Sequence, residues 1–121
     1  MGVLLFKVKL NTEPVTWGTD DAKKRTKIRE LIRKQIPQFS EQYIEHLIKD
    51  FAEISIGLNC YLIDPIAKDI DNLAKIPIDA IFFAAQNERG YREWESKITS
   101  LTVKKIKSRE NALEIILYGT T

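Results

Sequence analysis

Three aspartates and a lysine recur at short intervals within one otherwise apolar segment of this chain. The segment reads KDIDNLAKIPIDAIFF (residues 68–83) and contains Asp69, Asp71, Lys75 and Asp79. Carboxylates gathered on one surface repel one another unless a cation intervenes. Hard oxygen ligands of this kind suit Mg²⁺, which keeps several waters and is often completed by a substrate phosphate. These residue types therefore indicate metal-assisted chemistry on a phosphodiester.

The spacing of these residues places them on one side of a helix. Each residue of a helix turns by about 100°, so with Asp71 at zero, Lys75 falls near about 40° and Asp79 near about 80°. The apolar residues gather on the other side, at about 120 to 200°; they are Leu73, Ile76, Ala80 and Phe83. Asp69 comes just before, at the end of a loop. Pro77 suggests that the regular helix begins close to Lys75.

The same residues can also be explained by helix stability alone, without a metal site. Asp71 can cap a helix, Asp69 can interact with the helix dipole, and Asp79 can pair with Lys75 four residues away. Each of these interactions would contribute about 0.3 to 1 kcal/mol. A calcium-binding loop is excluded, because the position that requires glycine is occupied by Ala74.

The elements that must position this segment can be read from periodicity. Residues 3–10 alternate as a strand, and the apolar spacing from Thr19 to about Gln35 predicts a helix that ends before Pro37. Ser40 opens a second, short helix. Residues 54–62 alternate as a second strand, which is followed by the acidic helix.

Two further strands are predicted near the end of the sequence. They cover residues 98–106 and 112–118, and the turn KSREN between them predicts a hairpin. The order β-α-(α)-β-α-β-β predicts one α+β domain over residues 1–121, with a mixed four-stranded sheet and helices on one face.

Composition excludes several classes of protein. The chain has 121 residues, 44% of them hydrophobic and 30% charged, which is typical of a globular domain. No apolar run is long enough to span a membrane, and the first residues lack the features of a signal peptide, so we expect a cytoplasmic protein. Cys60, the single cysteine, excludes an internal disulfide and is expected inside a strand. His46 has no partner for a catalytic relay and is expected to be exposed.

Basic residues form two clusters, although the net charge is only +2. The first lies in the predicted helix after residue 19 and the second in the third strand. The residues that we expect to contact nucleic acid are Lys23, Lys24, Arg25, Lys27, Lys104 and Lys105. For each cluster taken alone, a solvated face is the favoured interpretation.

The acidic segment resembles a known family. DIDNLAKIPIDA (residues 69–80) is similar to the signature D-x-D-N-x-x-K-x-x-x-D-A of the RusA-type Holliday-junction endonucleases. The position of this motif, after the second strand and before two more strands, also agrees. The similarity covers roughly residues 54–118, whereas the first half agrees in layout and basic character.

The resemblance implies a homodimeric, magnesium-dependent endonuclease that cuts four-way DNA junctions. It implies that Asp69, Asp71 and Asp79 are metal ligands and that Lys75 is a catalytic lysine. The last family acid aligns with Glu95 in WESKI, where Trp94 replaces the acid that usually precedes it. The candidate residues for the dimer contact are Phe82, Phe83 and Trp94, and an ordinary core position is the alternative for each phenylalanine.

Two other functions remain open at this point. The first alternative is a non-catalytic module that binds branched nucleic acid through its basic helix. The second is a partner-binding protein whose charged faces are merely solvated. Junction binding without magnesium binding or cleavage would favour the first alternative over the nuclease. Negligible binding to every nucleic acid at low salt would favour the second alternative over both.

Overall fold

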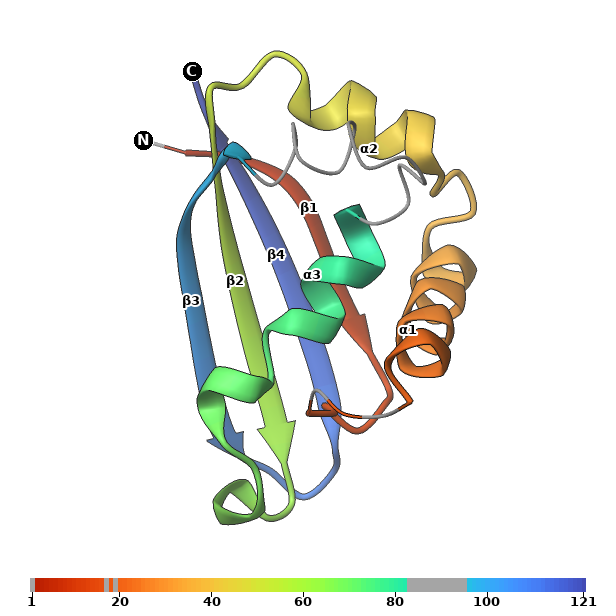
Figure 1. The fold of residues 1–121 in the computed structure, drawn as a ribbon, viewed down its shortest axis with the longest axis vertical. Helices are drawn as coiled ribbons and strands as arrows, with labels where there is room; N and C mark the ends of the chain where they lie inside the picture. The colour runs from red at the N-terminus through yellow and green to blue at the C-terminus, as the bar shows by residue number, and fades with distance from the viewer. Residues whose placement is uncertain (1, 17, 19, 83–95) are drawn as a thin grey trace.

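One sheet and a layer of helices make up the described structure. A computed structural model of the chain describes residues 2–16, 18, 20–82 and 96–121. Its elements, in chain order, are β1 (Val3–Leu10), α1 (Asp21–Gln35), α2 (Glu41–Ile48), β2 (Glu53–Leu62), η1 (Pro65–Ala67), η2 (Ile70–Asn72), α3 (Lys75–Phe82), β3 (Ile98–Lys107) and β4 (Ala112–Thr120). The described helices lie on one face of the sheet (Figure 1), which confirms the predicted two-layer α+β arrangement.

The strands form a mixed sheet in the order β1-β4-β2-β3. β4 pairs antiparallel with both β1 and β2, whereas β2 and β3 are parallel. Parallel neighbours need a crossover connection. The segment between β2 and β3, which carries the acidic motif, is that connection.

The predicted hairpin is wrong. β3 and β4 follow one another in the chain, but β2 lies between them in the sheet. The connecting turn passes over the end of β2 and is bonded to it: the Ser108 amide donates to the Leu62 carbonyl at 2.9 Å, and the Ile63 amide donates to Asn111 Oδ1 at 3.0 Å. The turn residues were correctly located, but a local turn pattern does not reveal that the turn spans an intervening strand.

The core lies between the sheet and the helices. β2 contributes its alternate residues, and Ile54, Leu58 and Cys60 are at most 1% exposed, as the period-two pattern predicts. Ile28 and Ile32 of α1 are also buried. Burying one such aliphatic side chain stabilises the fold by about 1.5–3 kcal/mol, so this shared core holds the helices on the sheet.

The two N-terminal helices begin and end close to where the sequence predicts. The Ser40 hydroxyl accepts a hydrogen bond from the Tyr43 amide at 3.1 Å, which confirms the predicted start of α2. α1 ends at Gln35, two residues before Pro37. Thr19, the predicted cap of α1, lies outside the described residues.

The acidic segment is not one continuous helix. It consists of two short 3₁₀ turns, η1 and η2, followed by α3, which begins at Lys75. Pro77 is therefore the third residue of α3, where an amide proton would have no partner within the helix. The predicted start near Lys75 is confirmed, and the calculated helical angle of Asp71 does not apply, because Asp71 lies in η2.

Gly119 of β4 is required by a close contact with the segment that leads into β2. A Cβ atom at this position would lie 2.5 Å from Cγ of Phe51, whereas at Gly57 of β2 it would lie 3.8 Å from its nearest neighbour, Cβ of Ile116. The Phe51 ring is partly buried against the core. Gly119 therefore provides the space in which this ring packs.

The predictions for His46 and Cys60 agree with the structure. His46 is exposed, and Cys60 is buried in β2. Burial raises the pKa of the Cys60 thiol to about 11, so this thiol stays protonated and unreactive at neutral pH. Among the described helices, none has the length and apolar character needed to cross a membrane.

Candidate functional site

The three predicted acids of the motif differ in their exposure. Asp69 occupies the N-cap position of η2, and Asp71 lies within η2; both are exposed. Asp79 lies on α3 and is only 7% exposed. Asp71 is not the cap of α3, because α3 begins four residues later. The 3₁₀ turn thus presents two carboxylates to water, while the helix carries the third one inward.

Asp79 is paired with Lys75. The Lys75 Nζ atom lies 3.3 Å from Asp79 Oδ2, which confirms the pair that the i,i+4 spacing predicts. The lysine side chain is 48% exposed and the aspartate side chain 10%. Because the lysine side chain is about half exposed, this pair contributes at most about 1 kcal/mol to stability. Its larger effect is to orient Lys75 at the start of α3.

Asp79 faces α1 rather than solvent. It lines a small cavity of about 130 Å³ together with Ala22, Arg25, Thr26 and Arg29, all of α1. Two arginines therefore share this cavity with the carboxylate. The sequence analysis did not assign Arg29 to the site, although its spacing of four residues from Arg25 placed both on one side of a helix.

The described residues do not gather Asp69, Asp71 and Asp79 into one metal site. Over residues 2–16, 18, 20–82 and 96–121, no group of three or more histidine, cysteine or acidic side chains is close enough to hold one ion. Glu95, the predicted fourth acid, and its neighbour Trp94 lie outside these residues. The ligand set of four carboxylates therefore stays a prediction.

The turn that carries Asp69 is held from two directions. From β3, Lys105 Nζ donates to the carbonyls of Pro65 at 2.9 Å and Lys68 at 2.8 Å. From the loop after β1, Glu13 pairs with Lys68 at 3.1 Å. Sequence reasoning missed this role of Lys105, although alternation along β3 places its side chain on the helix-covered face, in register with Cys60.

Replacing Lys105 by methionine should lower the free energy of unfolding by about 1–2 kcal/mol, because two carbonyl groups lose a charged donor. The adjacent Lys104→Met variant is the matched control, since Lys104 is exposed and surface changes of this kind usually stay within about 0.5 kcal/mol. The free energy of unfolding of both variants can be measured by urea titration, with circular dichroism as the signal. Equal destabilisation by the two variants would contradict the supporting role of Lys105.

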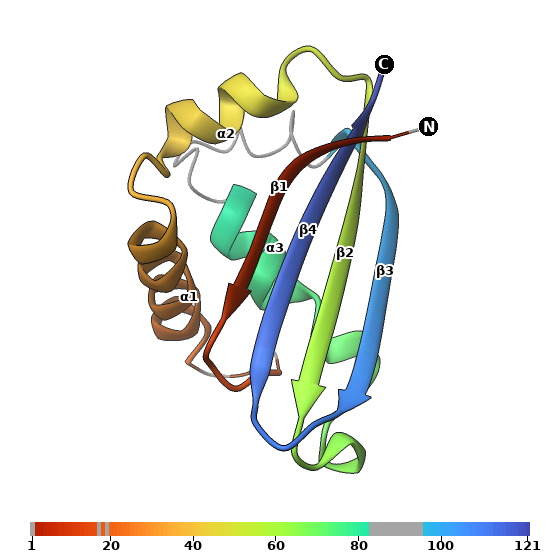
Figure 2. The same ribbon diagram turned by 180° about the vertical axis from the view of Figure 1, so that it is seen from behind.

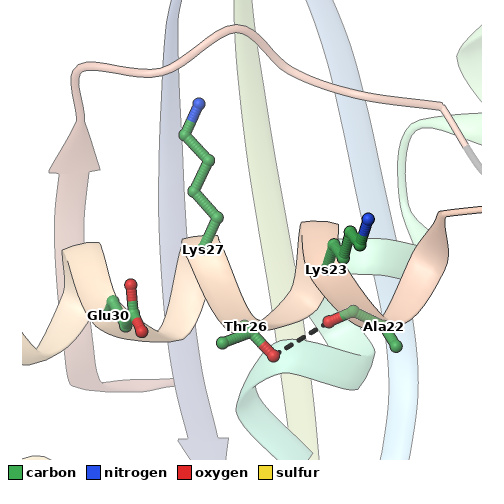
Figure 3. A pocket seen from close by; sticks show the side chains of 5 residues that line it. All are labelled: Ala22, Lys23, Thr26, Lys27 and Glu30. Carbon is green, nitrogen blue, oxygen red and sulfur yellow. Dashed lines mark hydrogen bonds between the residues drawn. The ribbon is translucent and has the colours of Figure 1, made fainter.

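The predicted nucleic-acid contacts of α1 divide into two pairs. Lys23 and Lys27 are exposed and extend from the same side of the helix (Figure 3), where they border a hollow of about 340 Å³. Lys24 instead donates to the Thr16 carbonyl at 3.0 Å, and Arg25 lines the cavity of Asp79. Only the first pair presents its ammonium groups outward.

The two lysines of β3 that were predicted to contact nucleic acid lie on different faces of the sheet. In the parallel register Lys104 is opposite Asn59 and Lys105 opposite Cys60, so the two side chains point to opposite faces of the sheet. Lys105 lies on the helix side and is engaged with carbonyls, whereas Lys104 lies on the uncovered side. The two strand lysines therefore do not form one patch with α1.

Phe82, a candidate for the dimer contact, is fully buried in the core. It therefore takes the alternative role of an ordinary core residue. Phe83 and Trp94, the other candidates, lie outside the described residues.

No protein-family model matches the sequence, and no curated protein matches it either.

Proposed function

We propose that this chain is a magnesium-dependent endonuclease of the RusA type that cuts four-way DNA junctions. The observation that supports this most is the meeting of α1 and α3. The hollow beside Lys23 and Lys27 and the cavity closed by Asp79 both have Ala22 and Thr26 in their walls. Lys23 and Lys27, with Glu30 on the same wall, thus lie beside the cavity that contains Asp79 of the Lys75–Asp79 pair.

The exposed acids of η2 fit a magnesium ion. Mg²⁺ is usually bound by one or two carboxylates, several waters and substrate phosphate. Asp69 and Asp71 offer two exposed carboxylates in one short turn and would hold the ion. When bound, the ion would activate water and neutralise charge on the scissile phosphate. The resemblance adds Asp79 and Glu95 to this ligand set, although in the structure Asp79 is paired with Lys75 and is not grouped with Asp69 and Asp71.

The chain's own cations have separate roles in this proposal. Lys75, oriented by Asp79 at 3.3 Å, would stabilise negative charge that develops on the phosphate or on the leaving oxygen. Lys23 and Lys27 would bind backbone phosphates without reading sequence, so affinity for the junction should fall steeply with salt. Resolution of a junction needs two symmetric cuts, which a two-fold dimer with one site per copy supplies.

A cleavage assay with and without magnesium tests this function. The substrate is a synthetic four-way DNA junction with one labelled strand, and a linear duplex of the same sequence is the control. We expect paired cuts in the junction with Mg²⁺ only, and little cutting of the duplex. Sedimentation at the same concentrations should give a dimer. If no branched substrate is cleaved, with or without Mg²⁺, the proposed nuclease activity is refuted.

A second function, a non-catalytic module for branched DNA, is favoured by the environment of Asp79. This carboxylate is 7% exposed and already paired with Lys75, as a purely structural acid would be. Junction binding without cleavage, together with no magnesium binding in isothermal titration calorimetry, would select this second function.

A further inference from the structure

The face of the sheet opposite the helices is a surface of its own. Figure 2 views the sheet from this side, where none of the described helices covers it. Its central residues are, by register, Ser55, Gly57, Asn59 and Tyr61 of β2 with Glu114, Ile116 and Tyr118 of β4. We call this surface the open face. It is remote from η2 and α3, which lie on the other side.

Lysines flank the open face at both edges of the sheet. Lys7 and Lys9 lie on β1, opposite Ile116 and Glu114, and Lys104 lies on β3, opposite Asn59. All three are exposed. The acids of this face are Glu53, at the start of β2, and Glu114, whose carboxylate already accepts a hydrogen bond from Asn59 Nδ2 at 2.8 Å. The two edges are thus positive, which complements an anionic chain that crosses the strands.

Aromatic rings lie between these edges. Tyr118 is 40% exposed, and Lys9 Nζ lies 4.4 Å from the ring centroid of Tyr61. Beside Tyr118 is a shallow hollow of about 210 Å³, whose walls include Ser55, Thr102 and Lys104. Gly57 has no side chain to fill this hollow. The face therefore combines an exposed ring, hydroxyl groups and an ammonium group around one depression.

We propose that the open face binds single-stranded DNA, with a base stacked on Tyr118 and phosphates held by Lys7, Lys9 and Lys104. Exposed aromatic rings on a four-stranded sheet backed by helices are a known arrangement for unpaired bases, which need only a π-face to stack. The choice of DNA over RNA rests on the proposed function, because a junction nuclease meets DNA strands. The binding surface itself does not depend on cleavage.

A second copy of the chain is the competing occupant, and charge argues against it. If two open faces pack about a two-fold axis parallel to the strands, β1 of one copy lies over β3 of the other. If the axis is perpendicular to the strands, β1 lies over β1. Either arrangement brings the edge lysines of the two copies together, and like charges at close range repel. Phosphates meet the same lysines favourably.

Fluorescence anisotropy with a labelled single-stranded DNA oligonucleotide tests the proposal. Tyr118→Leu should weaken binding about tenfold, because one stacked base is worth about 1–3 kcal/mol and 1.4 kcal/mol is tenfold. Tyr118→Phe, which keeps the ring, should bind like the parent chain. Lys104→Gln should reduce the slope of log K against log salt concentration by about 0.7. Lys49→Gln, which removes an exposed charge just after α2, is the control and should change neither quantity.

The outcomes are decisive in each arm. Unchanged affinity in both Tyr118→Leu and Lys104→Gln would overturn the proposal, as would a loss of binding in Lys49→Gln equal to theirs. Tighter binding of RNA of the same sequence would overturn the choice of DNA. A dimer that Tyr118→Leu converts to monomer, with DNA binding intact, would assign the face to a second copy. Asp71→Asn should bind the oligonucleotide normally, so failure of cleavage leaves this test unaffected.

Discussion

The Asp71→Asn variant should cut a four-way DNA junction about a thousandfold more slowly than the parent chain. Asparagine keeps the size of the side chain but removes the charge that would hold Mg²⁺, and a loss of about 4 kcal/mol in the transition state corresponds to about a thousandfold in rate. Because Asp71 is exposed in η2, the variant should fold normally. Single-turnover cleavage of a labelled junction measures the rate, and a gel-shift assay measures binding, which should persist.

Asp64→Asn is the matched control for this experiment. Asp64 is also exposed, precedes the other 3₁₀ turn of the same connection, and makes no side-chain capping hydrogen bond. Asp64→Asn removes the same charge but no proposed metal ligand. Because a distant exposed charge is largely screened by salt, the variant should cut the junction within about twofold of the parent rate. Full magnesium-dependent cleavage by Asp71→Asn would remove Asp71 from the mechanism.

The Gly119→Ala variant should be less stable than the parent chain by about 2–3 kcal/mol, which is the upper range for overpacking a filled core. The added methyl group would lie 2.5 Å from Cγ of Phe51 and 2.6 Å from Cδ1. Cγ is the attachment point of the ring, so a rotation of the ring alone does not remove the clash. Urea unfolding, analysed at constant m-value, gives the change in free energy.

Gly57→Ala tests whether this loss depends on position. Gly57 is also a strand glycine, but its added methyl group would only touch Ile116 at an ordinary distance of 3.8 Å. Alanine restricts the unfolded chain more than glycine, so we expect unchanged or slightly higher stability, by up to about 1 kcal/mol. If Gly119→Ala is as stable as Gly57→Ala, the packing of Phe51 against β4 is not as described.

Periodicity predicted most elements because a strand or helix that is buried on one side has apolar residues at regular intervals in its sequence. The alternation from Ile54 to Leu62 located β2, and Ser40 located the start of α2. Pro77 also indicated where α3 begins. These signals are local, since each depends on residues within one or two turns of the chain.

The features that escaped prediction depend on contacts between distant segments. The turn between β3 and β4 has hairpin chemistry, but its path over β2 depends on the hydrogen bonds of Ser108 and Asn111 to the end of that strand. Similarly, helical geometry placed Asp79 opposite the apolar side. Only the packing of α1 on α3 decides that this acid faces Arg25 and Arg29 instead of water.

The strand order also affects how the chain acquires its fold during synthesis. Among the described strands β4 is made after the other three, yet it is the strand that joins β1 to β2. Until it leaves the ribosome, β1 lacks its only neighbour among the described strands, and β2 exposes one edge. Domains generally fold as units, and exposed strand edges are prone to aggregation. A nascent chain that pauses before β4 has left the ribosome would therefore be an open, association-prone intermediate.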